Sequence, residues 1–149
     1  MGAGTSATEM VFFITSIIIA LSVVGAIFMN VQSISNAATI GSKILTEQLK
    51  TDITVINDPS IIPYSSGKYT FYVKNTGKEE LDTELINVII DGTIISNSAL
   101  NKTIIGGDQT WLTGDVLKIN ATIGSLAVGS HNLRVITANG IEDTFPFRT

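Results

Sequence analysis

The stretch MVFFITSIIIALSVVGAIFMNV, residues 10–31, decides how the chain is organised. It carries no charged side chain, and Ile, Val, Phe, Leu and Ala dominate it. A helix rises about 1.5 Å per residue, so this stretch would span about 33 Å, enough to cross the hydrocarbon core of a bilayer. A lone segment in lipid must satisfy its backbone hydrogen bonds internally, which a helix does. We therefore predict a transmembrane helix over residues 10–31, in preference to a buried helix of a soluble domain.

Residues 1–9 form a short N-terminal segment, MGAGTSATE, which lacks the basic start of a secretory signal peptide. We therefore expect an uncleaved anchor. Ser6 or Thr8 is a candidate helix cap, and the acidic Glu9 suits the positive end of the helix dipole. After the apolar stretch, residues 32–50 keep apolar side chains at helical spacings, which predicts a helical stalk. Its narrow apolar stripe predicts packing on its own domain or on a neighbouring copy, and we expect a homo-oligomer.

The N-terminus has a second interpretation, pilin-type processing. Precursors of type IV pilins and archaellins are cut after a Gly that precedes a long apolar helix with Glu at its fifth mature position. A cut after Gly4 would make Thr5 the first residue and Glu9 the fifth. Such precursors carry a basic residue beside the cut, where this chain has Ala3. We therefore prefer the uncleaved anchor, and the alternative depends on Gly4 and Glu9.

Residues 51–149 change from a helical to an alternating pattern. The strongest signal is LINVIIDGTIIS, residues 85–96, where Asp91-Gly92 separates two β-branched runs and predicts a two-residue type I′ hairpin. Alternation predicts further strands over 52–57, 69–75 and 111–123, and a second hairpin over 132–145. Pro146 suits an edge strand. Short strands at roughly ten-residue spacing, with no helices between them, predict an all-β immunoglobulin-like β-sandwich over residues 51–149.

The composition excludes several classes of function. A net charge of −4 with nine Lys and Arg residues argues against nucleic-acid binding. The chain has no Cys and a single His, His131, so it lacks disulfides, thiolate ligands and a multi-histidine metal site. No motif for a catalytic site or for phosphate binding is present. We expect no enzyme, no cofactor and no small-molecule substrate.

The remaining polar and aromatic candidates have simpler explanations. An acidic run could collect a divalent cation, but a solvated loop is the preferred interpretation, because a run does not guarantee converging oxygens. We expect His131 in a solvated loop and Trp111 in the core. We expect Gly77 to supply a positive φ to a turn over residues 75–78. The acidic run consists of Glu79, Glu80, Asp82 and Glu84.

Two features point to the surface of the sandwich. The 85–96 hairpin has apolar residues on both faces, so one face is a candidate interface. Asn101-Lys102-Thr103 and Asn120-Ala121-Thr122 are acceptor triplets for N-glycosylation and favour an extracytoplasmic domain. Lys43 and Lys50 mildly favour the opposite orientation, so charge leaves the topology open. The predicted interface residues are Val88, Ile89, Ile90, Ile94 and Ile95.

Three further stretches of the sequence are informative: SATEMVFFITSIIIA (6–20), LTEQLKTDITVINDP (45–59) and YTFYVKNTGKEEL (69–81). Together they resemble the FlaG (ArlG) family of archaellum accessory proteins. The resemblance implies a single membrane helix and an immunoglobulin-like sandwich in the archaeal pseudo-periplasm. It also implies a stator of the rotary motor that acts with FlaF (ArlF) and the S-layer, and it carries over no catalytic residue. The alternative is an archaellin or type IV pilin-like filament subunit.

Overall fold

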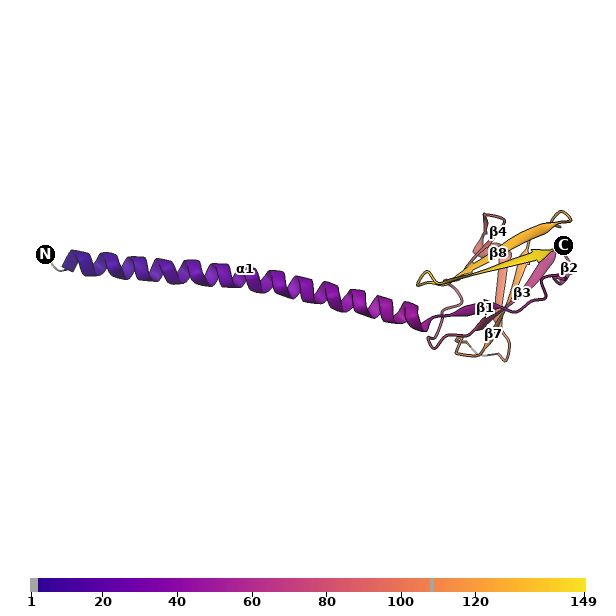
Figure 1. Ribbon diagram of the computed structural model, residues 1–149, viewed down its shortest axis with the longest axis horizontal. Coiled ribbons are helices and arrows are strands. Elements are labelled where there is room, and N and C mark those ends of the chain that lie inside the picture. Colours follow the sequence, from indigo (N-terminus) through magenta and orange to yellow (C-terminus); the bar gives the residue numbers. More distant parts are fainter. Residues whose placement is uncertain (1–2, 108) are drawn as a thin grey trace. The chain divides into compact units, whose positions relative to one another are not determined.

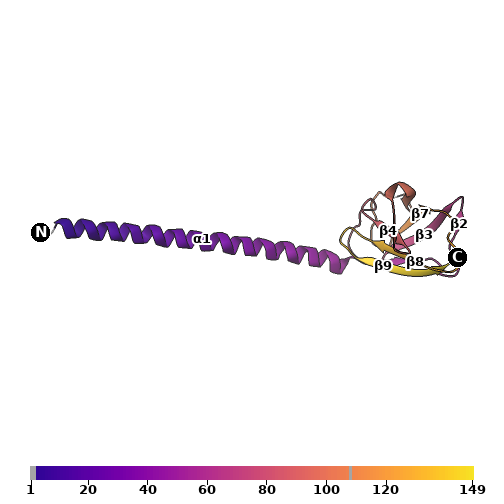
Figure 2. The same cartoon turned by 90° about the horizontal axis from the view of Figure 1, so that it is seen from above.

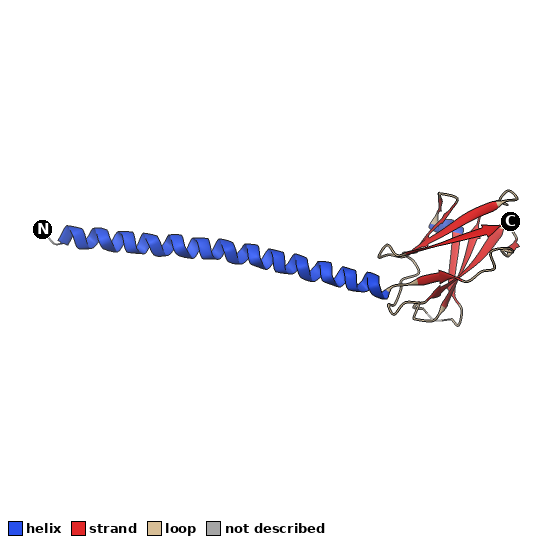
Figure 3. Ribbon diagram, viewed as in Figure 1, coloured by secondary structure: helices blue, strands red, loops and turns tan. Residues whose placement is uncertain are grey.

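The computed structural model describes residues 3–107 and 109–149, so Met1 and Gly2 of the N-terminal segment lie outside the described residues. The chain divides into two compact units, Met1–Lys43 and Ile44–Thr149. A single helix, α1 (Ala3–Lys50), forms the first unit and contributes its last two turns to the second (Figures 1 and 3).

Helix α1 is long and apolar enough to cross a membrane. Its apolar side chains in residues 10–31 are exposed around the whole helix, as in a segment that meets lipid on every side. The hydroxyls of Thr15, Ser16 and Ser22 donate to the carbonyl four residues earlier, at 2.7–2.8 Å, and so satisfy their polar groups within the helix.

The predicted N-cap is wrong. Helix α1 already includes Ala3, so Ser6, Thr8 and Glu9 lie inside it. The Thr8 hydroxyl donates back to the Gly4 carbonyl at 2.9 Å instead of capping a free backbone N–H. Residues 32–50 continue the same helix to Lys50.

The second unit contains two antiparallel sheets packed face to face, which confirms the β-sandwich (Figures 1 and 2). One sheet has five strands in the order β1-β3-β7-β6, with β2 also paired to β3, and the other has four in the order β5-β4-β8-β9. The five-stranded sheet comprises β1 (Ile53–Val55), β2 (Tyr64–Ser65), β3 (Lys68–Asn75), β6 (Leu100–Ile104) and β7 (Val116–Thr122). The four-stranded sheet comprises β4 (Asn87–Ile90), β5 (Thr93–Ile95), β8 (Ser130–Ile136) and β9 (Glu142–Arg148), and a 3₁₀ turn, η1 (Asn97–Ala99), precedes β6.

Alternation along the strands builds the core between the sheets. In β3 every second residue is buried, and the other side chains face solvent. Phe71 of β3 meets Phe147 of β9 edge to face, with ring centroids 5.5 Å apart, and so joins the two inner faces. Trp111 is fully buried, as predicted, and its Nε1 donates to the Asp115 carbonyl at 3.0 Å.

Both predicted hairpins are present. Asp91 and Gly92 both have positive φ, 50° and 78°, as a type I′ turn requires, and Gly140 has φ 82° in the turn between β8 and β9. Pro146 lies in the edge strand β9. The strand prediction over 111–123 is partly wrong, because β7 begins at Val116 and Trp111 makes only an isolated bridge to Leu81. Strands β2 and β6 were not predicted.

Candidate interaction surface

The outer face of the four-stranded sheet carries a row of two isoleucines. Ile89 of β4 and Ile94 of β5 are cross-strand partners. On the same face, Ile89 also pairs with Arg134 of β8, and Arg134 pairs with Thr144 of β9. Ile94 is 63% exposed. Since directly opposite side chains on one face lie about 5 Å apart, the two isoleucines form one apolar contact. We call Ile89 and Ile94 the isoleucine row.

Three residues of the predicted interface face the core instead. Val88 and Ile90 are 0% and 3% exposed, because they alternate with Ile89 and point between the sheets. Ile95 is the cross-strand partner of Val88 and packs against the same core cluster. The sequence also missed Ile136, a half-buried residue of β8 that shares the outer face with the row.

Two neighbouring edge strands, β1 and β9, are tied to each other. The Val55 N–H of β1 donates to the Asp143 carboxylate of β9 at 2.7 Å. The Arg148 N–H of β9 donates to the Pro59 carbonyl at 2.9 Å. These contacts occupy backbone groups that would otherwise be open to a further strand.

The edge strand β6 is protected differently, by a lysine that points inward. The Lys102 ammonium donates to the carbonyls of Thr83, Glu84 and Ile86 at 2.8, 3.1 and 3.0 Å. Burial lowers the pKa of Lys102. An inward-pointing charge on an edge strand disfavours pairing with another chain. The two sheets end in β1 and β6, and in β5 and β9, so β5, which carries Ile94, is the remaining edge strand.

The hairpin that presents the isoleucine row is fixed to strand β8. His131 lies in β8, with its side chain 12% exposed, so the solvated-loop prediction was wrong. Its ring is held between the Ala127 carbonyl and the Asp91 carboxylate of the hairpin turn. Two hydrogen bonds raise the pKa of His131. The bond to the Ala127 carbonyl has the larger effect, and the bond to the Asp91 carboxylate has the smaller. The bond from His131 lowers the pKa of Asp91, and the Asn132 N–H adds to this effect.

The last turn of α1 is bonded to two turns of the sandwich. Gln48 Nε2 donates to the Asn139 carbonyl at 2.9 Å, and Lys78 N–H donates to the Lys50 carbonyl at 2.7 Å. Gly77 does not have a positive φ, contrary to the sequence prediction. It is required for space, because a Cβ at Gly77 would lie 2.4 Å from Lys50 O and 2.5 Å from Asp52 N.

The buried side chain of Asn75 holds this turn together. Its Nδ2 donates to the carbonyls of Glu79 and Trp111 at 2.9 and 3.1 Å, and its Oδ1 accepts from Gly77 N–H at 3.1 Å. The Asn75 side chain is fully buried, and all three of its bonds are made to backbone groups. The NTGK turn is therefore a junction between the helix end and the sandwich.

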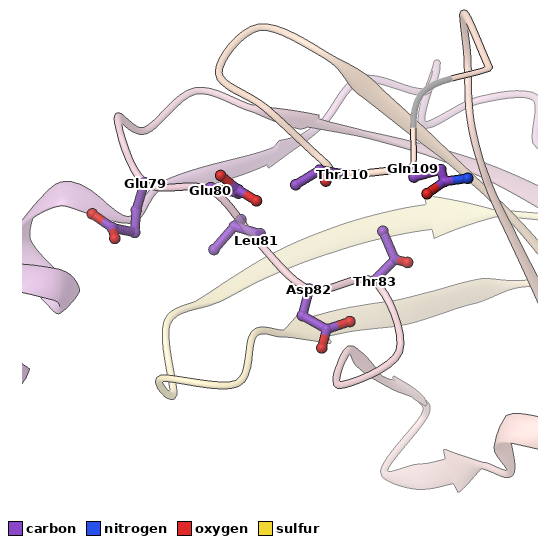
Figure 4. A pocket seen from close by; sticks show the side chains of 7 residues that line it. All are labelled: Glu79, Glu80, Leu81, Asp82, Thr83, Gln109 and Thr110. Atoms are coloured by element: carbon purple, nitrogen blue, oxygen red, sulfur yellow. The ribbon is translucent and has the colours of Figure 1, made fainter.

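Three residues of the acidic run, Glu79, Glu80 and Asp82, line a polar cavity of about 480 Å³ (Figure 4). The carboxylates of Glu79, Glu80 and Asp82 point in different directions and do not converge. Within residues 3–107 and 109–149, no group of three or more acidic or His side chains is placed to hold a metal ion. Glu84 lies beyond this cavity, near Lys102, where its charge partly offsets the effect of burial on the pKa of that lysine.

Known proteins resemble the chain over nearly its full length. The family model for archaeal-type flagellin matches residues 2–147. A flagella-related protein G of Methanocaldococcus jannaschii is 31% identical over 143 residues, covering 93% of this chain and 92% of that protein. A flagella-related protein G of Methanococcus voltae is 30% identical over 144 residues, covering 93% of each.

One solved structure matches part of this chain at lower sequence identity. The archaellum periplasmic stator protein FlaG of Sulfolobus acidocaldarius is 18% identical, with a TM-score of 0.44, and covers 65% of this chain and 99% of its own. The near-complete match to the family model, together with two relatives at 30% identity or above, identifies the family. The chain belongs to the archaeal-type flagellin family and, within it, to the flagella-related protein G group of archaellum accessory components.

Proposed function

We propose that the chain is a membrane-anchored stator component of the archaellum motor, which ties the membrane to the S-layer together with a FlaF-like protein. In this proposal α1 crosses the membrane once, through residues 10–31, and the sandwich lies in the pseudo-periplasm. The names of the two Methanocaldococcus and Methanococcus relatives support a place in the archaellum. The FlaG protein of Sulfolobus acidocaldarius is itself called a periplasmic stator protein.

The observation that carries the proposal is the junction at the end of α1. A stator must transmit load, because a rotating filament exerts a reaction torque and a fluid bilayer resists lateral force poorly. Gln48 and Lys50 of the last helical turn are bonded to turns of the sandwich, and Gly77 packs against the backbone at Lys50. A force on this turn therefore reaches the two sheets through short, partly buried backbone contacts.

The isoleucine row is the contact surface in this proposal. Its partner is a FlaF-like protein or a second copy of the chain in a homo-oligomer. Ile94 is exposed and lies in the edge strand β5, and Ile89 beside it is half-buried, so the pair forms a surface that a second β-domain can cover.

A filament subunit is the second candidate function. The family model that matches residues 2–147 is that of archaeal-type flagellin, and Glu9 stands fifth after Gly4. Processing after Gly4 would release Thr5 as the first residue. An uncleaved N-terminus keeps the chain in the membrane, as the stator proposal requires.

The two candidates make opposite predictions for cell fractions. Archaella are sheared from cells that produce the chain, and the N-terminal residue and intact mass of the chain are measured in the filament and membrane fractions. The stator proposal predicts an uncleaved chain in the membrane fraction and none in the filaments. A chain that begins at Thr5 and is recovered as a bulk component of the filaments would overturn the stator in favour of the filament subunit.

The link to the wall needs a separate experiment. The full chain in lipid nanodiscs is incubated with a purified FlaF-like protein, with S-layer fragments, or with both. The proposal predicts that the chain retains S-layer fragments only when the FlaF-like protein is present. Retention that does not depend on the FlaF-like protein would contradict its role as the link.

A further inference from the structure

The two glycosylation triplets lie next to each other on one sheet. Asn101 of β6 and Asn120 of β7 are direct cross-strand partners. Directly opposite side chains on a sheet face have Cβ atoms about 5 Å apart. A glycan is bulky and needs open surface, so two glycans rooted at this spacing would compete for the same space. One of the two asparagines should therefore be the better acceptor.

The outer face that carries both asparagines is hydrophilic. Apart from Tyr72 and Val116, its outward positions are occupied by Ser, Thr, Lys or Asn, so this face can remain solvated beneath a glycan. The isoleucine row lies on the outer face of the other sheet and would stay uncovered. The polar outward residues are Thr54, Ser65, Lys68, Thr70, Lys74, Asn101, Thr103, Lys118, Asn120 and Thr122.

Asn101 is more exposed to solvent than Asn120. It lies in the edge strand β6, and its side chain is exposed. Its Oδ1 accepts a hydrogen bond from the hydroxyl of Thr103, the third residue of its own triplet, at 3.2 Å. The amide and the hydroxyl that define an acceptor triplet therefore meet at the open edge of the sheet.

Asn120 is more enclosed. Strand β7 lies between β3 and β6, so Asn120 has a neighbouring strand on each side and is half-buried. Its Oδ1 accepts from the Thr70 hydroxyl of β3 at 2.9 Å, and this bond holds the side chain against the centre of the sheet.

We infer that Asn101 is the N-glycosylation acceptor of this chain and that Asn120 stays unmodified. This modification site goes beyond the stator function. In the reaction, Asn101 Nδ2 bonds to the anomeric carbon of a lipid-phosphate-linked oligosaccharide. The bond between that carbon and the phosphate oxygen breaks, the lipid phosphate leaves with the electron pair, and Nδ2 loses one proton. The glycan on β6 then blocks strand addition at that edge, as the inward-pointing Lys102 already does from within.

The test is the intact mass of the full chain extracted from membranes of an archaeal host that glycosylates its surface proteins. Wild type should carry a mass excess over its polypeptide, equal to a single glycan. Asn101→Gln and Thr103→Ala should lose the excess, because each destroys the triplet at Asn101. Thr103→Ser should keep it, because serine retains the hydroxyl. Asn120→Gln should also keep it and is the matched control.

Three results would overturn the inference. A wild-type chain without a mass excess has no glycan at Asn101. An excess that disappears in Asn120→Gln but persists in Asn101→Gln places the glycan on the wrong strand. An excess that falls by half in each single variant means that both asparagines are modified. Thr103→Ser also guards against misfolding, since it differs from Thr103→Ala chiefly in the hydroxyl.

Discussion

The imidazole of His131 is hydrogen-bonded to the carboxylate of Asp91, with Nδ1 2.6 Å from Oδ2. The other ring nitrogen, Nε2, lies 2.7 Å from the Ala127 carbonyl. Both partners are acceptors, so only the doubly protonated imidazolium can donate to both at once. Asp91 also accepts from the Asn132 N–H at 2.8 Å. One protonation event thus supports the hairpin turn, strand β8 and the loop before β8.

We expect the stability of the sandwich to fall as pH rises through the folded-state pKa of His131. The pKa of His131 is raised from its ordinary value of 6.5, so its contribution is fully present below 6.5 and disappears above the raised value. The free energy of unfolding is measured by denaturant titration of the full chain in detergent between pH 5 and pH 9. His131→Gln should be less stable than wild type at acidic pH, and the difference should shrink as pH rises. A difference that is the same at every pH would contradict the imidazolium assignment.

Substitution of Gly77 by Ala should destabilise the junction between α1 and the sandwich. The new Cβ would meet two backbone atoms, Lys50 O at 2.4 Å and Asp52 N at 2.5 Å, and backbone atoms cannot rotate away. Overpacking of this kind costs about 1–3 kcal/mol in the free energy of unfolding. Gly124→Ala is the control, because a Cβ there would meet no heavy atom within 4 Å. Equal stability of the two variants would show that the backbone at Lys50 and Asp52 leaves room for a Cβ at Gly77.

Substitution of Asn75 by Ala should cost more than an exposed Asn-to-Ala change. It removes three bonds and leaves the Glu79 carbonyl, the Trp111 carbonyl and the Gly77 N–H without this partner. The Gly77 N–H still donates to the Asp52 carbonyl, and the Trp111 carbonyl still accepts from the Leu81 N–H, so neither group is left unpaired. A hydrogen bond contributes about 0.5–1.5 kcal/mol, so the loss of three bonds should lower the free energy of unfolding by about 2–4 kcal/mol. Asn87→Ala, at an exposed strand position, should change stability by less than about 1 kcal/mol. If the two variants unfold at the same denaturant concentration, Asn75 does not organise the turn.

The sequence predicted those parts of the fold in which local pattern and tertiary environment agree. An uncharged apolar stretch of the length of residues 10–31 favours a helix in lipid, and Asp91-Gly92 favours a type I′ turn. The helix and the hairpin were therefore both predicted correctly. Strand β6 was missed because its inward positions include Lys102, whose ammonium finds three carbonyls that belong to a distant loop. In an alternating pattern, a lysine normally indicates the solvent-facing side of a strand. The inward position of Lys102 depends on three carbonyls that the local sequence does not reveal.

The candidate surface was harder to predict than the fold. Isoleucine occurs at consecutive positions in the 85–96 hairpin, so the sequence alone does not distinguish the face of Ile89 from that of Ile90. The register between β4 and β8 makes this distinction, because Ile90 pairs with the buried Leu133. The role of Gly77 also depends on a contact with the end of α1, which no local turn rule contains.

Ile94→Asp and Ile95→Asp should have different effects although the residues are adjacent. Ile94 is 63% exposed on the outer face, so a carboxylate there should change the free energy of unfolding by less than about 1 kcal/mol. Ile95 packs against the core cluster, where an unpaired carboxylate costs several kcal/mol, so Ile95→Asp should unfold the hairpin. If the isoleucine row is the contact surface, Ile94→Asp should lower the particle mass of the detergent-solubilised full chain, measured by light scattering, and reduce swimming in complemented cells. Ile61→Asp, at an isoleucine that is 73% exposed in the loop before β2, makes the same chemical change elsewhere and should leave both properties intact. A normal particle mass and normal swimming for Ile94→Asp would move the contact surface away from the β4–β5 hairpin.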